Sequence, residues 1–165
     1  FYGDATRLDL LRTAGAGTAK VLVVAVDGVE QSLAIVDMVR EHFPNARIIA
    51  RARNVGHLYQ LLDRKVEFIE RELFESSLRS ARSVLEGLGW PPHEAREATM
   101  RFRRRNIELM HELYPHYKDR AKLIAAAKEG RQQFQEQMAR EREERKQRAG
   151  QDWNLAAEEE RSIAE

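Results

Sequence analysis

The sequence predicts an α/β fold, namely the second half of a doubly wound, Rossmann-like parallel sheet followed by a helical C-terminal extension. Three observations lead to this prediction. Residues 21–26 form a continuous apolar run rich in valine, which is typical of a strand buried on both faces of a parallel sheet. Strand and helix signals alternate over residues 1–70, whereas residues 71–117 carry helix periods alone.

The N-terminal part opens with a short amphipathic helix around Leu8, Leu10 and Leu11, which ends at Gly15, a residue that favours a left-handed helix cap. The expected strands then lie at 21–26, 47–51 and 66–69, and the expected helices at 31–43 and 55–64. Residues 1–4 resemble the end of a strand and its turn. We therefore expect the natural protein to be longer, with the Gly-rich phosphate loop in a preceding half.

The C-terminal part is predicted to be helical. Apolar residues at helix spacing indicate one helix over 74–88 and a second over 92–113, whose first turn contains the favourable Pro92 and Glu94. Residues 118–149 contain strong helix formers but almost nothing apolar after Met138, so we expect a polar helical tail. Residues 150–165, with a lone Trp153, are expected to be a mobile end.

Composition excludes several classes of protein. Lys plus Arg number 28 and Asp plus Glu 27, which gives a net charge of +1 and argues against a nucleic-acid binder. The absence of cysteine excludes disulfides, thiolate zinc sites and thiol redox chemistry. The longest aliphatic run is far shorter than the roughly 20 residues of a membrane helix, so we expect this segment to be soluble.

No catalytic arrangement emerges, and we expect a protein that is not an enzyme. Gly15 and Gly17 follow a helix and precede a strand, the reverse of a dinucleotide fingerprint. Tyr114 and Lys118 have the Tyr-x-x-x-Lys spacing of a short-chain dehydrogenase, but Pro115 interrupts the helix turn which that chemistry needs. The histidines lack the spacing of a zinc site.

Three polar features remain. Arg51 and Arg53 follow the second strand at the end where open α/β sheets bind ligands, although ordinary surface arginines would have the same spacing. Arg71 follows the third strand between two glutamates. Asn106 interrupts the apolar stripe of the last helix, where a polar side chain is costly unless it is hydrogen-bonded. It can satisfy a backbone group, bind a polar ligand or set the register of a helix pair.

The chain resembles a known family in four blocks that occur in order, at residues 1–7, 47–53, 70–75 and 102–106. Over about residues 1–115 it is similar to the C-terminal regulatory domain of the Kef-type glutathione-regulated potassium efflux proteins. The first block alone indicates the wider class of nucleotide-binding potassium-transport domains, called KTN or RCK domains, and the later blocks narrow it to Kef.

The resemblance implies a cytosolic homodimeric domain of a potassium/proton antiporter, carried on the same polypeptide at the cytoplasmic face of the bacterial inner membrane. In that family glutathione closes the transporter and glutathione adducts open it. Glutathione-binding residues of the family match Arg71 and Asn106, and an AMP or NAD(H) site would have Gly3 and Asp4 at its rim. A flavin oxidoreductase-like ancillary subunit is a further implied partner. The Asp that is usual in relatives is Asn54 here.

These expectations divide the chain into a partial nucleotide-binding domain (1–70), a helical dimerisation and ligand-binding extension (71–117) and a polar helical tail (118–165). The function expected is a regulatory domain that senses ligands. Two alternatives stay open. A soluble Trk-type subunit would bind NAD(H) but not glutathione, and a Rossmann oxidoreductase fragment would depend on Tyr114 and Lys118.

Overall fold

A computed structural model describes the chain except for residues 1–2, 120, 137–138 and 141–165. The chain forms two compact units, residues 1–117 and residues 118–165. In the second unit residues 121–136 and 139–140 are helical. Of the tail expected to be exposed beyond about residue 138, residues 139–140 are exposed, and the rest, with Trp153 in it, lies outside the described residues.

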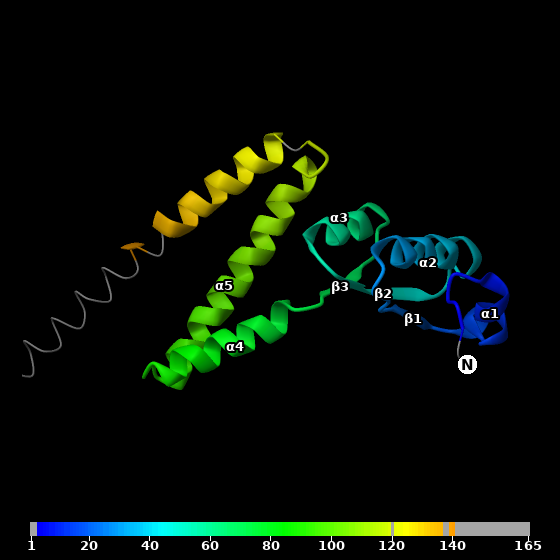
Figure 1. Ribbon diagram of the computed structural model, residues 1–165, viewed down its shortest axis with the longest axis horizontal. Coiled ribbons are helices and arrows are strands. Elements are labelled where there is room, and N and C mark those ends of the chain that lie inside the picture. Colours follow the sequence, from blue (N-terminus) through cyan, green and yellow to red (C-terminus); the bar gives the residue numbers. More distant parts are fainter. Residues whose placement is uncertain (1–2, 120, 137–138, 141–165) are drawn as a thin grey trace, which may run out of the picture. The chain divides into compact units, whose positions relative to one another are not determined.

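The first unit contains a parallel three-stranded sheet in the order β1-β2-β3. Helices and strands alternate up to the end of the sheet and only helices follow, as Figure 1 shows, so the predicted fold class is confirmed. The elements are α1 (Leu8–Thr13), η1 (Ala16–Thr18), β1 (Val21–Val24), α2 (Val29–His42), β2 (Arg47–Ala52), α3 (Val55–Asp63), β3 (Phe68–Arg71), α4 (Phe74–Gly87), α5 (Pro92–Leu113) and η2 (Tyr114–His116).

The core lies between one face of the sheet and the helices α2 and α3, which run along the same side of the strands in Figure 1. The buried apolar side chains come from these helices, from alternate strand residues and from the links, and include Val36, Val39, Ile48, Ala50 and Leu61. Their alternation along β2 follows the two-residue period of a strand, which turns every second side chain toward the helices.

The other face of the sheet is open in the described part of the chain. The register places Val23 beside Ile49 and Ile49 beside Phe68, so an apolar row crosses all three strands. Val23 is 66% exposed and Val21 46% exposed. The prediction that residues 21–26 are buried on both faces is therefore wrong for the described residues, because α2 and α3 cover only one face. The strand also ends at Val24.

The third strand begins two residues later than expected. Lys65 adopts the left-handed conformation, with φ of 56°, and the N–H of Val66 donates to the carbonyl of Leu61. This turn takes Val66 out of the sheet and buries its side chain against the core. Phe68 is thus the first residue that pairs with β2.

The helices α4 and α5 form a hairpin after the sheet. The left-handed Gly89, with φ of 86°, terminates α4, and the N–H of Trp90 donates to the carbonyl of Leu85. No residue of α4 is buried, and Leu88 is 72% exposed. The helix therefore packs against α5 while much of its apolar surface stays open. No described helix is both long and apolar enough to cross a membrane.

Candidate functional site

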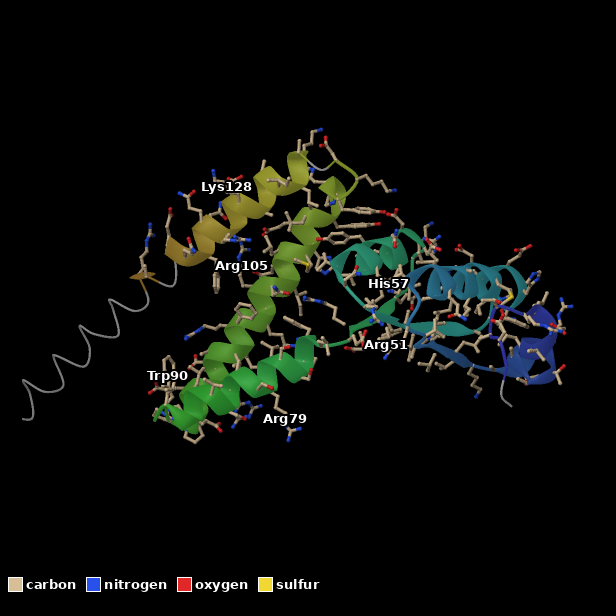
Figure 2. The ribbon with its side chains drawn as sticks, viewed as in Figure 1. Arg51, His57, Arg79, Trp90, Arg105 and Lys128 are labelled. Carbon is tan, nitrogen blue, oxygen red and sulfur yellow. The ribbon has the colours of Figure 1, made fainter. Side chains whose placement is uncertain are left out.

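The carboxyl ends of the strands hold a network of charged side chains. Arg51 donates from Nη2 to the carbonyl of Ala25, at 2.8 Å, and to Oδ1 of Asp27, at 2.7 Å. Its Nη1 lies 3.9 Å from a carboxylate oxygen of Glu72. Figure 2 labels Arg51 at the end of the sheet from which the chain runs on toward α4. The position agrees with the expected crevice, but carboxylates of this chain already balance the Arg51 charge.

Arg53 also reaches Asp27, with Nη1 at 3.7 Å from its carboxylate. The backbone N–H of Arg53 donates to Nδ1 of the buried His57, at 3.2 Å. Burial lowers the pKa of His57, and the nearby Arg64 lowers it further. A neutral imidazole keeps its Nδ1 lone pair for this hydrogen bond. His57 therefore holds the loop that carries Arg53.

Asn54 has a structural role in the same loop. Its side-chain oxygen accepts a hydrogen bond from the N–H of His57 at 2.9 Å and caps the N-terminus of α3. An aspartate would cap this helix equally well, so the difference from the relatives leaves the cap intact.

Gly3 and Asp4 lie in the turn before α1. The Asp4 carboxylate accepts hydrogen bonds from the N–H of Thr6, at 2.9 Å, and from its hydroxyl, at 2.7 Å. These bonds lower the pKa of Asp4, with a smaller contribution from Gln31 of α2. A Cβ at Gly3 would stand 2.8 Å from the end of the Leu10 side chain, so the turn packs closely on α1.

Arg71 and Asn106 are in direct contact although 35 residues separate them. Nη1 of Arg71, at the end of β3, donates to Oδ1 of Asn106 in α5 at 2.5 Å. The Arg71 guanidinium also lies over the Phe74 ring, 4.0 Å from its centre. Burial lowers the pKa of Arg71, whereas the nearby Tyr59 and Glu75 raise it. The structure brings together the two residues that the sequence singled out separately.

The pair keeps donors for a further partner. Within the described residues, Nε and Nη2 of Arg71 and the amide NH₂ of Asn106 make no hydrogen bond. Three donors thus gather at a half-buried guanidinium and amide. This arrangement suits a ligand that has carboxylate and peptide oxygens.

Tyr114 does not stand on an α-helical turn with Lys118. Residues 114–116 form the 3₁₀ helix η2, and the Tyr114 hydroxyl donates to Oδ1 of Asp63 at 2.8 Å. Asp63 also accepts from Tyr117. The sequence did not single out this cluster. A signal for it exists in the helix spacing of Tyr59 and Asp63 and in the two tyrosines at 114 and 117. Among the described residues, no group of three or more His, Asp or Glu side chains is arranged to hold a metal ion.

Known proteins resemble both parts of the chain. Residues 1–69 match the family described as the TrkA-N domain, and residues 76–154 match the potassium efflux system KefB C-terminal domain. The glutathione-regulated potassium-efflux system protein KefC of Escherichia coli O139:H28 is 51% identical over 113 residues, which are 68% of this chain and 18% of that protein. KefC of Shigella boydii serotype 18 matches to the same extent, 51% over 113 residues.

The chain therefore spans less than a fifth of these relatives, at 18% of their length. A solved structure of the Kef C-terminal domain of Shewanella denitrificans in its AMP-bound form is similar in fold, with a TM-score of 0.68. It is 38% identical, and the match covers 70% of this chain and 73% of that one. Because the Shewanella domain is 38% identical and is matched over 73% of its length, it establishes the family of this chain. The chain belongs to the family of Kef C-terminal domains and has their Rossmann-like fold.

Proposed function

We propose that this chain is the ligand-sensing domain that gates a potassium efflux system working by potassium/proton antiport, closed by glutathione and opened by glutathione adducts. The names of the KefC relatives support glutathione regulation. The antiporter domain would belong to the same polypeptide, at the cytoplasmic face of the bacterial inner membrane, and a flavin oxidoreductase-like subunit would be an ancillary partner. The domain itself would bind ligands rather than catalyse a reaction.

The contact between Arg71 and Asn106 carries this proposal. Glutathione is a tripeptide with two carboxylates and two peptide groups. A guanidinium with Nε and Nη2 open can give one carboxylate two parallel charged hydrogen bonds, which a lysine cannot reproduce. The amide of Asn106 can donate to a peptide carbonyl beside it. One ligand would thus bridge β3 and α5.

A nucleotide would bind at the carboxyl ends of the strands, with Gly3 and Asp4 at the rim. AMP is the first candidate because the Shewanella relative was solved in an AMP-bound form, and NAD(H) is the second. The match of residues 1–69 to the TrkA-N domain agrees with a nucleotide site in this part. Arg51 and Arg53 would border the crevice, where both lie near the Asp27 carboxylate and Arg51 also lies near Glu72.

A second copy of the chain would complete the regulatory unit. The hairpin exposes the large apolar side chains Leu73, Val84, Leu88, Met100 and Phe102, more than the hairpin alone can bury. If two copies pair through this surface, two arrangements of the dimer would bind glutathione and its bulkier adducts with different affinity. Only such a difference can move a gate.

Calorimetric titration of the full chain with glutathione, an S-alkyl glutathione and NADH tests the proposal. Arg71→Ala and Asn106→Ala should each weaken glutathione binding by about 1 to 3 kcal/mol, the range for losing a hydrogen bond to a charged or buried group. Arg104→Ala, an exposed arginine two residues before Asn106, is the control and should bind as the parent does. Unchanged affinity in a folded Arg71→Ala variant would remove the site.

The same titration, together with an assay of hydride transfer, separates the alternatives. NADH binding without glutathione binding would favour a Trk-type sensor. Hydride transfer that depends on Tyr114 and Lys118 would favour an oxidoreductase, although the Tyr114 hydroxyl is already hydrogen-bonded to Asp63.

A further inference from the structure

Five side chains join the end of α5 to α3, and we call them the tyrosine clamp: Tyr59 and Asp63 of α3, Met110 of α5, and Tyr114 and Tyr117 after it. The ring of Tyr59 lies 5.7 Å from that of Tyr114 and 5.1 Å from that of Tyr117, centre to centre. Tyr114 and Tyr117 stack on each other at 5.8 Å. These distances are in the range of favourable aromatic pairs.

Asp63 and Tyr59 supply the polar contacts of the clamp. Oδ1 of Asp63 accepts from the Tyr114 hydroxyl at 2.8 Å, and Oδ2 accepts from the Tyr117 hydroxyl. The Tyr59 hydroxyl donates to Sδ of Met110 at 3.7 Å. Both oxygens of one carboxylate are therefore occupied by the segment at the end of α5. These two hydrogen bonds fix the orientation of the segment after α5 relative to α3 as well as its position.

The hairpin depends on such contacts for its position. The 22 residues of α5 span about 33 Å and the 14 residues of α4 about 21 Å, so the last turns of α5 extend about 12 Å beyond α4. No residue of α4 is buried. Besides the chain itself, the contacts that tie the hairpin to the α/β part include the Arg71–Asn106 hydrogen bond, the Arg71 guanidinium over the Phe74 ring and the clamp.

The clamp and the Arg71–Asn106 pair share one face of α5. Asn106, Met110 and Leu113 are spaced by four and three residues, which places them in line along the helix. Leu113 is buried, and Tyr59 is 2% exposed. The positive charge of Arg71 lowers the pKa of Tyr59 against the larger effect of burial, which raises it. Tyr59, a member of the clamp, is therefore close enough to Arg71 for the two groups to interact electrostatically.

We propose that the tyrosine clamp positions α5 against α3 and thereby holds Asn106 within reach of Arg71, with Asp63 as the positioning residue. A ligand that bridges Arg71 and Asn106 then meets a preformed pair. Without the clamp, α5 would leave this position for part of the time. The observed affinity would then equal the affinity of the preformed pair multiplied by the fraction of time that the pair is formed. As far as it concerns glutathione, this inference rests on the proposed function.

The chain has no cysteine, so spin labels can be attached at introduced cysteines alone. The labels go on the exposed Glu41 of α2 and His111 of α5, in the full chain diluted with unlabelled protein, and pulsed electron resonance measures their distance distribution. The variants are Asp63→Asn, the double variant Tyr114→Phe with Tyr117→Phe, and Asp63→Glu, which keeps the carboxylate. Asp37→Asn is the matched control because Asp37 also accepts two hydrogen bonds, both from Arg64, but does so between α2 and α3.

We expect a broader distance distribution in Asp63→Asn and in the double variant. Their affinity for glutathione should be about tenfold weaker if the Arg71–Asn106 pair is formed about a tenth of the time. Asp63→Glu should recover most of the affinity, and Asp37→Asn should change neither measurement. An unchanged distribution in both clamp variants overturns the clamp. A broadened distribution with unchanged affinity overturns its positioning role.

Circular dichroism checks that each variant folds. If Asp63→Asn does not fold, the test is made with the double phenylalanine variant. A parent chain that binds no glutathione contradicts the proposed function instead. The positioning role is then judged by the side-chain amide NMR signal of Asn106. The clamp variants should shift or broaden this signal, whereas Asp37→Asn should not, and an unshifted signal overturns the role.

Discussion

Changing Asn106 to Asp separates ligand binding from stability. The new carboxylate would stand where the Asn106 amide now accepts from Arg71 at 2.5 Å, and would form an ion pair. For two half-exposed groups such a pair contributes about 0 to 1 kcal/mol. For a chain of this size 1 kcal/mol corresponds to about 2 to 4 °C in Tm. We therefore expect Asn106→Asp to be as stable as the parent or slightly more stable.

The effect on glutathione binding has the opposite sign. A ligand carboxylate on the remaining edge of the Arg71 guanidinium would lie about 5 Å from the new carboxylate, and two like charges at that distance repel by about 3 kcal/mol at an effective dielectric constant of about 20. Salt reduces this value, so we expect a loss of about 2 to 3 kcal/mol, or roughly 30- to 150-fold.

Calorimetry and thermal unfolding of the same samples measure both effects. Asn45→Asp adds the same charge at an exposed position in the link between α2 and β2, and should leave the affinity near that of the parent. The reasoning fails if Asn106→Asp binds glutathione as tightly as the parent does. A strong loss of stability would instead mean that the amide itself is needed for packing.

Three further predictions concern the α/β part. Burial lowers the pKa of His57 in the folded chain, so the unfolded chain binds the extra proton and the unfolding free energy falls as pH drops below the unfolded pKa of about 6.5. His57→Gln should remove this pH dependence of stability, and urea unfolding at several pH values measures it. Asn54→Ala should cost about 1 kcal/mol of unfolding free energy through loss of the α3 cap, whereas Asn54→Asp should cost almost nothing, as equilibrium unfolding will reveal. Gly15→Ala should lower Tm, since the left-handed φ of 89° costs alanine roughly 1 to 2 kcal/mol, and scanning calorimetry checks it.

The sequence predicts the alternation of strands and helices because that pattern depends on local periodicity. The bounds of α5 follow from Pro92 at its start and the break after Leu113, and the end of α1 from Gly15. Burial is less predictable. The apolar run that includes Val23 indicates a strand covered on both sides, but only one side has a helix over it in the described residues. A run of apolar residues predicts a strand, not the partner that covers it.

The candidate site was predictable in part. Arg71 follows a strand and Asn106 interrupts an apolar stripe, so each stands out, yet no local pattern states that residues 35 positions apart touch. The tyrosine clamp was not predicted, because Tyr59 and Asp63 look like ordinary residues of an amphipathic helix. The sequence singles out Tyr114 through the Tyr-x-x-x-Lys spacing to Lys118, which indicates a different role. Long-range contacts of this kind depend on how the hairpin returns to the sheet, which helix periods do not determine.

The division of stability between the two parts bears on how a ligand could drive a gate. The main apolar cluster lies between the sheet and the helices α2 and α3, whereas α4 has no buried residue and α5 has only Ala95, Thr99 and Leu113. Contacts that tie the hairpin back include the Arg71–Asn106 hydrogen bond, the Arg71 guanidinium over the Phe74 ring and the tyrosine clamp, whose Asp63 is exposed. Elements with few buried contacts open at lower free energy than the core does. A ligand that contributes a few kcal/mol between β3 and α5 can therefore shift the hairpin without unfolding the sheet, as a regulatory domain requires.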